Sequence, residues 1–209
     1  MLSIHRLAFQ RQSIPILRQV ALHLDAGEVV LIRGENGSGK STLVRLLAGL
    51  VPAQDVFEVT LDGEPFSPGD PRCQARFAYL GHTLGLKDVL TCQENLSFYR
   101  QFLGAHPEGL SVSGALKACG LDGYQYSPAG RLSAGQRKRL ALARLLLRPV
   151  DIWLLDEPYS NLDAEGITLV DRLLQQHIDL NGRALLTSHG TFVPQVTRHR
   201  EVDMREFTQ

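Results

Sequence analysis

The sequence is poor in cysteine, methionine and tryptophan, with three, two and one residues among 209. Cys73, Cys92 and Cys119 are widely spaced and include no Cys-x-x-Cys pair. This pattern excludes a disulfide framework and a zinc site of the usual spacing, and it favours a reducing compartment. The seven histidines are scattered and also lack a metal-ligand spacing. The fold must therefore be stabilised by its hydrophobic core.

Net charge is also absent, because 22 Lys and Arg balance 22 Asp and Glu. Without an excess of positive charge the chain has no overall attraction to a phosphate backbone, so we expect no nucleic-acid partner. No apolar run reaches the roughly 20 residues of a membrane span. Met1–Arg6 does not resemble a signal peptide, and we expect a chain on the cytoplasmic side. Its length and 44% hydrophobic content suit one α/β domain, 1–209.

The feature that is present is a complete phosphate-binding loop. Glycines at fixed positions let successive backbone N–H groups point toward phosphate oxygens. A strand-like run before the loop and a helical pattern after it place the bound anion at a helix N-terminus. The lysine can reach the β- and γ-phosphates, and the first hydroxyl can hold Mg²⁺. The alternative is an ordinary glycine-rich turn. The loop reads Gly34-Glu35-Asn36-Gly37-Ser38-Gly39-Lys40-Ser41-Thr42.

The order of elements along the chain predicts a mostly parallel sheet with helices around it, preceded by a mixed or antiparallel part. Strands are expected near Leu2–Phe9, Val20–Leu24, Glu28–Arg33, Phe57–Leu61, Phe77–Leu80, Ile152–Leu155 and Ala184–Thr187. A helical region is expected over Gln93–Gly120, with Leu96, Tyr99, Phe102 and Leu103 on one face. Two more helices are expected, an amphipathic one over Gln136–Leu147 whose basic face carries Arg137, Lys138, Arg139 and Arg144, and one over Ala164–Leu180.

An apolar strand ends in two carboxylates at Asp156 and Glu157. Ligands of α/β sheets bind beyond the carboxyl ends of the strands, so the pair lies where the phosphate loop also leads. Asp156 is placed to hold Mg²⁺ through water, and Glu157 is the candidate base for the attacking water. Such a pair can also merely begin the next helix, but the complete phosphate loop favours catalysis.

A second anion-binding surface is indicated by the stretch Leu132–Gln136. Ser133 can cap the helix that begins near Gln136, and Gly135 permits a close backbone approach. A hydroxyl, a glycine N–H and a helix N-terminus together can bind a phosphate. Taken alone, a plain helix cap is the simpler interpretation.

In combination, these segments resemble the motifs of ABC-transporter ATPase subunits, and the resemblance spans almost the whole chain. The matching segments are, in order, Gly34–Thr42, Leu132–Gln136, Ile152–Glu157, Leu162-Asp163 and Ser188-His189. The resemblance implies a P-loop NTPase fold with a RecA-like core, an N-terminal antiparallel β part and an inserted helical subdomain. We expect the β part and core in 1–82 and 146–209, and the helical subdomain with the signature motif in 83–145.

The resemblance also implies a head-to-tail dimer with ATP and Mg²⁺ held between two copies. The signature residues Ser133, Gly135 and Gln136 would reach the γ-phosphate of the partner copy in trans. Asp163 would lie at the dimer seam, and His189 would contact the γ-phosphate as a second catalytic residue beside Glu157.

Two positions depart from the family pattern. Where the family places an aromatic residue to stack on adenine, this chain has Arg11, with Phe9 two residues earlier. A guanidinium can stack on a flat ring, which favours Arg11. Where the family places the Mg²⁺-sensing glutamine, this chain has His82, whose neutral imidazole can accept a hydrogen bond from water. The alternative for His82 is a surface loop histidine.

The segments Tyr79–Lys87 and Glu94–Tyr99, like Arg11, resemble the haem-exporter ATPases of bacterial cytochrome c maturation. That resemblance implies a peripheral protein on the cytoplasmic face of the inner membrane. It would pair with integral membrane subunits of the cytochrome c maturation system, and its ATP turnover would release a haem-loaded chaperone. We expect no haem on this chain itself, because its remaining histidines form no axial-ligand motif: His5, His23, His106, His177 and His199.

Two other functions stay open from the sequence. A soluble ABC ATPase of DNA repair or translation usually has a coiled-coil insert or two ATPase units, and this chain has neither. A nucleotide-binding module without turnover is disfavoured by the intact Lys40, Asp156 and Glu157. The identity and direction of the transported species depend on membrane subunits that this sequence does not contain.

Overall fold

The computed structural model describes residues 1–54, 56–104, 106–188 and 192–207. The chain divides into two compact units. The first comprises Met1–Tyr79, Val150–Pro158 and Asp171–Gln209, and the second comprises Leu80–Pro149 and Tyr159–Val170. The second unit thus contains the segment expected as a helical subdomain and, in addition, residues 159–170.

The first unit begins with an antiparallel sheet, as the sequence predicted. Its strands follow the order β2-β1-β4-β5, and every pair that they form is antiparallel. The Asp62-Gly63 turn joins β4 to β5 with φ of 54° and 87°, the left-handed backbone that a tight hairpin requires. The strands are β1 (Leu2–Arg11), β2 (Ile14–Leu24), β4 (Phe57–Leu61) and β5 (Glu64–Pro65).

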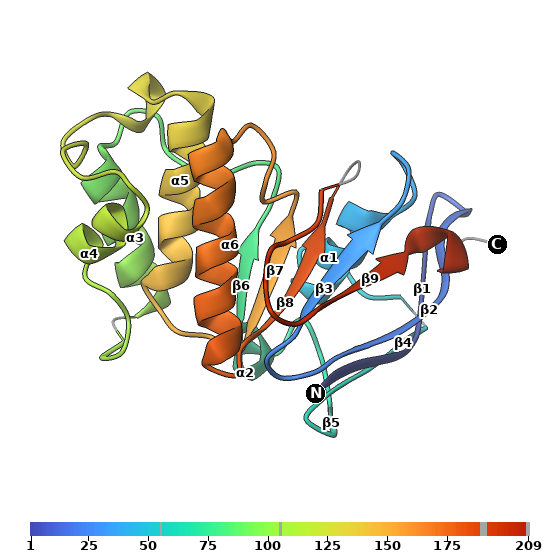
Figure 1. Ribbon diagram of the computed structural model, residues 1–209. Helices are drawn as coiled ribbons and strands as arrows, with labels where there is room; N and C mark the ends of the chain where they lie inside the picture. The colour runs from blue at the N-terminus through green and yellow to red at the C-terminus, as the bar shows by residue number, and fades with distance from the viewer. Residues whose placement is uncertain (55, 105, 189–191, 208–209) are drawn as a thin grey trace. The chain divides into compact units, whose positions relative to one another are not determined.

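A second sheet of five strands, in the order β6-β7-β8-β3-β9, forms the other half of the first unit (Figure 1). The pairs β7–β8, β8–β3 and β3–β9 are parallel. All residues of β7 and β8 are buried, as expected for central strands of a parallel sheet. The strands are β3 (Val29–Arg33), β6 (Phe77–Leu80), β7 (Ile152–Asp156), β8 (Arg183–Thr187) and β9 (His199–Asp203).

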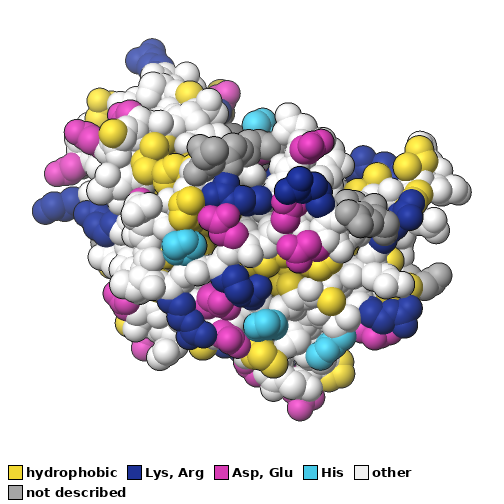
Figure 2. Space-filling model, turned by 45° about the vertical axis from the view of Figure 1, so that its right-hand side comes forward, with side chains coloured by type: hydrophobic (Ala, Val, Ile, Leu, Met, Phe, Trp, Pro, Cys, Tyr) yellow, Lys and Arg dark blue, Asp and Glu magenta, His cyan; other side chains and the backbone are white. Residues whose placement is uncertain are grey.

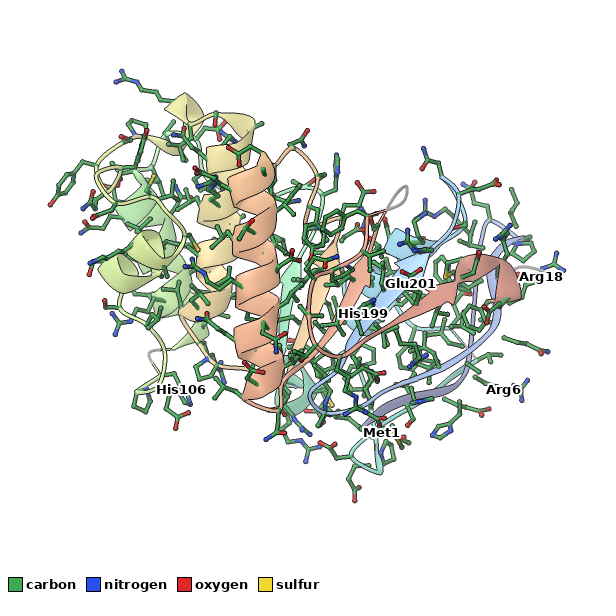
Figure 3. All side chains as sticks on the ribbon, viewed as in Figure 1. Met1, Arg6, Arg18, His106, His199 and Glu201 are labelled. Carbon is green, nitrogen blue, oxygen red and sulfur yellow. The ribbon has the colours of Figure 1, made fainter. Side chains whose placement is uncertain are left out.

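The edge strand β9 was not predicted from the sequence. Polar residues dominate it, and Figure 3 shows His199 and Glu201 along it. Glu201 forms an ion pair with Arg33 of the neighbouring β3. Opposite charges also lie side by side over the face in Figure 2, in keeping with the zero net charge of the chain.

The core of the first unit is one apolar cluster built from both sheets and helix α1 (Lys40–Leu47). Leu43 and Leu46 of α1 pack in it beside residues of β1, β2, β3, β4 and β7. This packing fixes α1, and with it the loop that precedes the helix. The other helical segments of the unit are α2 (Pro71–Gln74) and the 3₁₀ turn η3 (Met204–Phe207). Helix α6 (Ala164–Asp179) begins in the second unit and ends in the first.

The second unit is helical, and the helical region expected over Gln93–Gly120 consists of two separate helices. Helix α3 (Cys92–Leu103) starts at a capping box formed by Thr91 and Glu94 and ends at Gly104, whose φ is 78°. Helix α4 (Val112–Ala118) starts anew after the cap Ser111. The expected apolar face is also only partly buried, because Phe102 is 78% exposed.

The basic face predicted for Gln136–Leu147 is wrong. Helix α5 (Ala134–Ala143) carries its cations at consecutive positions, which project about 100° apart and cannot share a face. Each cation instead has a partner within the second unit. Lys138 is buried against Ser160, Arg137 pairs with Asp88, Arg139 pairs with Asp163, and Arg144 lies over the Tyr99 ring. The remaining 3₁₀ turns are η1 (Ala129–Arg131) and η2 (Arg144–Leu146).

Across the described ranges, no helix combines the length and apolarity needed to cross a lipid bilayer.

Candidate nucleotide-binding site

Three functional segments meet at one edge of the parallel sheet. Strands β7, β8 and β3 are neighbours in that order and run parallel. Their carboxyl ends therefore lie together and lead, respectively, into Asp156-Glu157, Thr187-Ser188 and the loop Gly34–Thr42. This is the edge at which α/β sheets bind ligands.

The loop after β3 has the conformation of an anion cradle. Gly34, Gly37 and Gly39 have φ of 147°, 84° and 93°, which residues with a Cβ rarely adopt. Gly39 is the N-cap of α1, and no described side chain caps this helix. The first N–H groups of α1 are therefore open to a ligand, and the helix dipole favours an anion there.

The cradle is pressed against the antiparallel sheet at Gly39. A Cβ added to Gly39 would lie 2.6 Å from Cδ2 of Leu17 and 3.2 Å from the carbonyl oxygen of Ile16. Only glycine fits this close approach. The contact also brings Ile16 beside the cradle, a residue that no motif in the sequence indicates.

A pocket of about 280 Å³ opens over the cradle. Arg11, one of the two candidates for stacking on adenine, lines this pocket. Phe9, the other candidate, is only 7% exposed and belongs to the hydrophobic core. The geometry therefore favours Arg11 over Phe9. The lining residues are Arg11, Ile16, Asn36, Gly37, Ser38, Gly39, Lys40, Ser41 and Thr42.

Lys40 places a buried cation in the cradle. Its side chain is 5% exposed, and Nζ donates hydrogen bonds of 2.7 Å to the carbonyl oxygens of Gly34 and Glu35. Burial lowers the pKa of Lys40, while the charges of Glu157 and Asp156 act in the opposite direction. A phosphate would supply the nearby negative charge that favours the ammonium form.

Asp156 is 1% exposed and is held by two hydroxyl groups. Its Oδ1 accepts hydrogen bonds from Ser41 Oγ at 2.8 Å and from Thr187 Oγ1 at 2.7 Å. Its Oδ2 is buried and accepts none from the described residues, and the Arg45 guanidinium lies 3.9 Å from it. A hydroxyl and a carboxylate with one open oxygen are hard oxygen ligands, so these residues fit Mg²⁺.

Glu157 follows Asp156 with a left-handed backbone, at φ of 54°. Its N–H donates to Thr187 Oγ1 at 3.0 Å. Outside glycine, such a conformation is strained and tends to occur at functional positions.

Thr187 links the two acidic residues, since its hydroxyl accepts from the Glu157 N–H and donates to Asp156. It is fully buried. No motif in the sequence predicts this role for Thr187. The available signal was a polar residue at the end of a buried apolar strand, just before Ser188.

The signature segment lies in the second unit and begins helix α5. Ser133 is the N-cap and forms a capping box with Gln136, with hydrogen bonds of 3.0 and 3.2 Å. This confirms the helix cap that the sequence predicted. Ser133 is exposed, and its hydroxyl is at the surface. A Cβ at Gly135 would lie 3.3 Å from the carbonyl oxygen of Asn161.

Three candidate residues remain: Asp163, His82 and His189. Asp163 is exposed, and its Oδ1 accepts hydrogen bonds from the Gly166 N–H at 2.8 Å and from Arg139 at 2.9 Å. These two bonds, in that order, lower the pKa of Asp163. His82 is exposed and lies in the second unit. His189 falls outside the described residues.

Comparison with known proteins gives one consistent family. The family profile "ABC transporter" matches residues 17–160. The cytochrome c biogenesis ATP-binding export protein CcmA of Xanthomonas oryzae pv. oryzae is 46% identical over 201 residues, covering 96% of this chain and 92% of the relative. The protein of the same name from Pseudomonas fluorescens is 37% identical, covering 95% and 93%.

Solved structures agree with the fold. The ATP-binding cassette MJ0796, a dimeric structure of a post-hydrolysis state bound to ADP and Pi, matches with a TM-score of 0.76 at 24% identity, covering 91% of this chain and 88% of that one. An ATP-binding subunit of an ABC transporter matches with a TM-score of 0.80 at 23% identity, covering 90% and 79%. At these identities the likeness supports the α/β P-loop fold.

Proposed function

The chain belongs to the ABC transporter family, and we propose that it is the ATP-hydrolysing subunit of an export complex in bacterial cytochrome c biogenesis. The family assignment makes it an ATP-binding ATPase. The specific process rests on relatives with 37–47% identity that carry the name of a cytochrome c biogenesis export protein. Within that process, we propose that ATP turnover drives haem handling and the release of a haem-loaded chaperone.

The observation that carries the catalytic part of the proposal is the junction of β3, β7 and β8. There an uncapped helix N-terminus, the buried Lys40 and the buried Asp156 lie around one edge of the sheet. A triphosphate is the ligand that satisfies all three groups, because it brings negative charge to the N–H groups and the ammonium and can share a cation with the carboxylate.

In this proposal the cradle binds the phosphates through its backbone N–H groups. Lys40 exchanges its bonds to Gly34 and Glu35 for the β- and γ-phosphate oxygens, and the Ser38 hydroxyl, buried without a partner among described groups, donates to a phosphate. Arg11 stacks on the adenine at the mouth of the pocket.

Ser41 and Asp156 are the residues that would hold Mg²⁺. When bound, the ion would neutralise charge on the β- and γ-phosphates. Thr187 keeps Oδ1 of Asp156 fixed, so that Oδ2 is the oxygen left to face a ligand. His82 is proposed to sense the site through a water molecule.

Glu157 is the proposed general base. Its carboxylate accepts a proton from the water that attacks the γ-phosphorus, while the bond from that phosphorus to the bridging oxygen of ADP breaks. The Thr187 hydroxyl fixes the Glu157 backbone and thereby the direction of its side chain. His189 is proposed to contact the γ-phosphate as a second catalytic residue.

We propose that the site is completed by a second copy of the chain in a head-to-tail dimer. Ser133, Gly135 and Gln136 of that copy would bind the γ-phosphate, with Asp163 at the seam. The exposure of Ser133 supports this role, because a hydroxyl at a helix N-terminus is then open to a partner's phosphate.

We further propose that the dimer binds integral membrane subunits on the cytoplasmic face of the inner membrane. The word "export" in the relatives' names supports a membrane partner. No nucleic-acid partner is proposed.

Glu157→Gln tests the catalytic assignment. The variant should bind ATP normally, hydrolyse it at least about 100-fold more slowly because a positioned base is lost, and accumulate as an ATP-bound dimer. Glu64→Gln, at an exposed position of β5, is the matched control and should behave as wild type. Near-normal turnover in Glu157→Gln would show that another group is the base.

Purification from bacterial membranes tests the biological assignment. The tagged chain should co-purify with integral membrane subunits of cytochrome c maturation, identified by mass spectrometry of the intact complex. Cells that carry only Glu157→Gln should lose mature c-type cytochromes. Recovery of the chain without a membrane partner, together with ATPase stimulation by nucleic acid, would instead favour a non-transport ABC ATPase.

A further inference from the structure

The second unit contains a buried lysine that neither the phosphate cradle nor the acidic pair uses. Lys138 of α5 is 3% exposed, and its Nζ donates to Ser160 Oγ at 3.2 Å. A buried ammonium loses its hydration, so a lysine in such a position is costly unless its partners are well placed. A residue of this kind calls for a specific role.

The loop that Lys138 contacts is the one that carries the proposed seam residue. Residues 159–163 lead into α6, and Asn161 has a left-handed backbone with φ of 61°. The exposed Asn161 and Asp163 stand on either side of Leu162. The loop therefore offers polar groups to a partner while its Ser160 is tied to α5.

A second tether acts from the next residue of the same helix. Arg139 donates to Asp163 Oδ1 at 2.9 Å, and it is 15% exposed. Consecutive helix residues project about 100° apart, so Lys138 and Arg139 hold the loop at two separate points. Gly135 is closer to the N-terminus of α5 than these two residues, and it lets the backbone of the helix approach the Asn161 carbonyl oxygen.

We propose that Lys138 is a positioning residue that fixes the loop 159–163 to the signature helix, so that Ser133 and Asp163 meet the second copy as one rigid surface. The inference rests on the proposed head-to-tail dimer. Lys138 does not touch the nucleotide in this scheme. It acts by keeping two contact points of the dimer in register, since misplacement of a binding group by about 1 Å can cost up to 100-fold in rate.

The test compares Lys138→Met, which keeps an unbranched side chain but removes the ammonium group, with Lys138→Arg, which keeps the cation. Lys117→Met is an exposed control on α4. At a temperature well below unfolding, Lys138→Met should lower kcat about 10-fold or more and leave the KM for ATP unchanged. Lys138→Arg should recover most of the rate. Lys117→Met should match wild type.

Dimer formation is measured by light scattering with ATP in the Glu157→Gln background. Adding Lys138→Met should weaken the dimer about 10-fold, and Ser160→Ala should have a similar effect that does not add to it. Ser160→Ala also serves as the test if Lys138→Met fails to fold. An unchanged dimer and unchanged kcat in both variants would overturn the role of Lys138. If Glu157→Gln alone forms no dimer with ATP, the dimer proposal fails, and this inference fails with it.

Discussion

The histidine buried deepest among those described predicts a loss of stability in mild acid. His177 of α6 is 9% exposed, and its ring stacks on Trp153 of β7, with ring centres 4.1 Å apart and an angle of 7° between the planes. Its Nε2 lies 3.1 Å from the carbonyl oxygen of Arg183, so Nε2 carries the hydrogen. The site has no spare room, because a Cβ on Gly182 would lie 2.4 Å from the ring.

Burial lowers the pKa of His177 from the ordinary 6.5 to about 4. The hydrogen bond to Arg183 and the charge of Asp151 act in the opposite direction, and the Arg183 cation lowers the pKa further. Between these two pH values the unfolded chain binds more protons than the folded chain. The free energy of unfolding therefore falls as pH drops from 6.5 toward 4, by about 2 kcal/mol at pH 5 and about 3 kcal/mol in full.

Trp153 makes the measurement direct, because it is the only tryptophan in the sequence. Urea unfolding followed by its fluorescence at pH 7.5 and pH 5.0 gives the stability difference in wild type. His177→Phe keeps an aromatic ring beside Trp153 and removes the titration. Between the two pH values, the free energy of unfolding of this variant should change by about 2 kcal/mol less than that of wild type.

His199→Gln is the matched control, since His199 is exposed on β9. It should retain the pH dependence of wild type, because the substitution leaves the His177 ring and its contacts with Trp153 and Arg183 in place. If His177→Phe and wild type lost equal stability within about 0.5 kcal/mol, the argument from burial would be refuted.

Two further predictions concern the nucleotide site. Lys40→Ala should weaken ATP binding about 10- to 100-fold, as expected for the loss of a charge-assisted hydrogen bond. Titration with a fluorescent ATP analogue measures this affinity, and an unchanged affinity would contradict the role of Lys40. Thr187→Val keeps the shape of the side chain but leaves the Glu157 N–H without its acceptor and Asp156 with one donor fewer. This substitution should destabilise the protein by about 1–3 kcal/mol and lower kcat more than it changes KM. A thermal midpoint and a kcat like those of wild type would argue against the bridging role of Thr187.

The sequence predicted the central elements of the first unit because their patterns have few alternatives. Four consecutive apolar residues starting at Ile152 suit a buried strand, and β7 begins there. The phosphate loop could be predicted because backbone geometry requires its glycines at fixed positions. Local pattern alone therefore predicted a mostly parallel α/β sheet, and the more detailed fold class came from the resemblance to a known family.

The structure and contacts of residues that depend on partners elsewhere in the chain could not be predicted from the sequence. Strand β9 is mostly polar, and its place beside β3 is fixed by pairing that no local pattern encodes. Lys138 looked like part of a solvated basic face, because only the fold brings Ser160 to it. Thr187 acquires its role only when β8 is placed next to β7.

The choice between Arg11 and Phe9 shows the same limit at a single strand. Both residues are on β1, and side chains of alternate residues share a face of a strand. Phe9 nevertheless lies in the core while Arg11 is exposed at the pocket, because the pairing of β1 with β2 shifts in register between Phe9 and Gln10. An irregularity of this kind cannot be read from residue alternation.

The strained backbone of Glu157 predicts how this position would change in evolution if catalysis were no longer required. Glycine adopts a φ of 54° without the penalty of about 1 kcal/mol that other residues carry there. A substitution to glycine would therefore make the folded protein more robust and leave it without its proposed base. In a lineage that no longer needs ATP turnover, selection for the glutamate would be lost, whereas the gain in stability from glycine would remain. We therefore expect this codon to be among the first of the site to change.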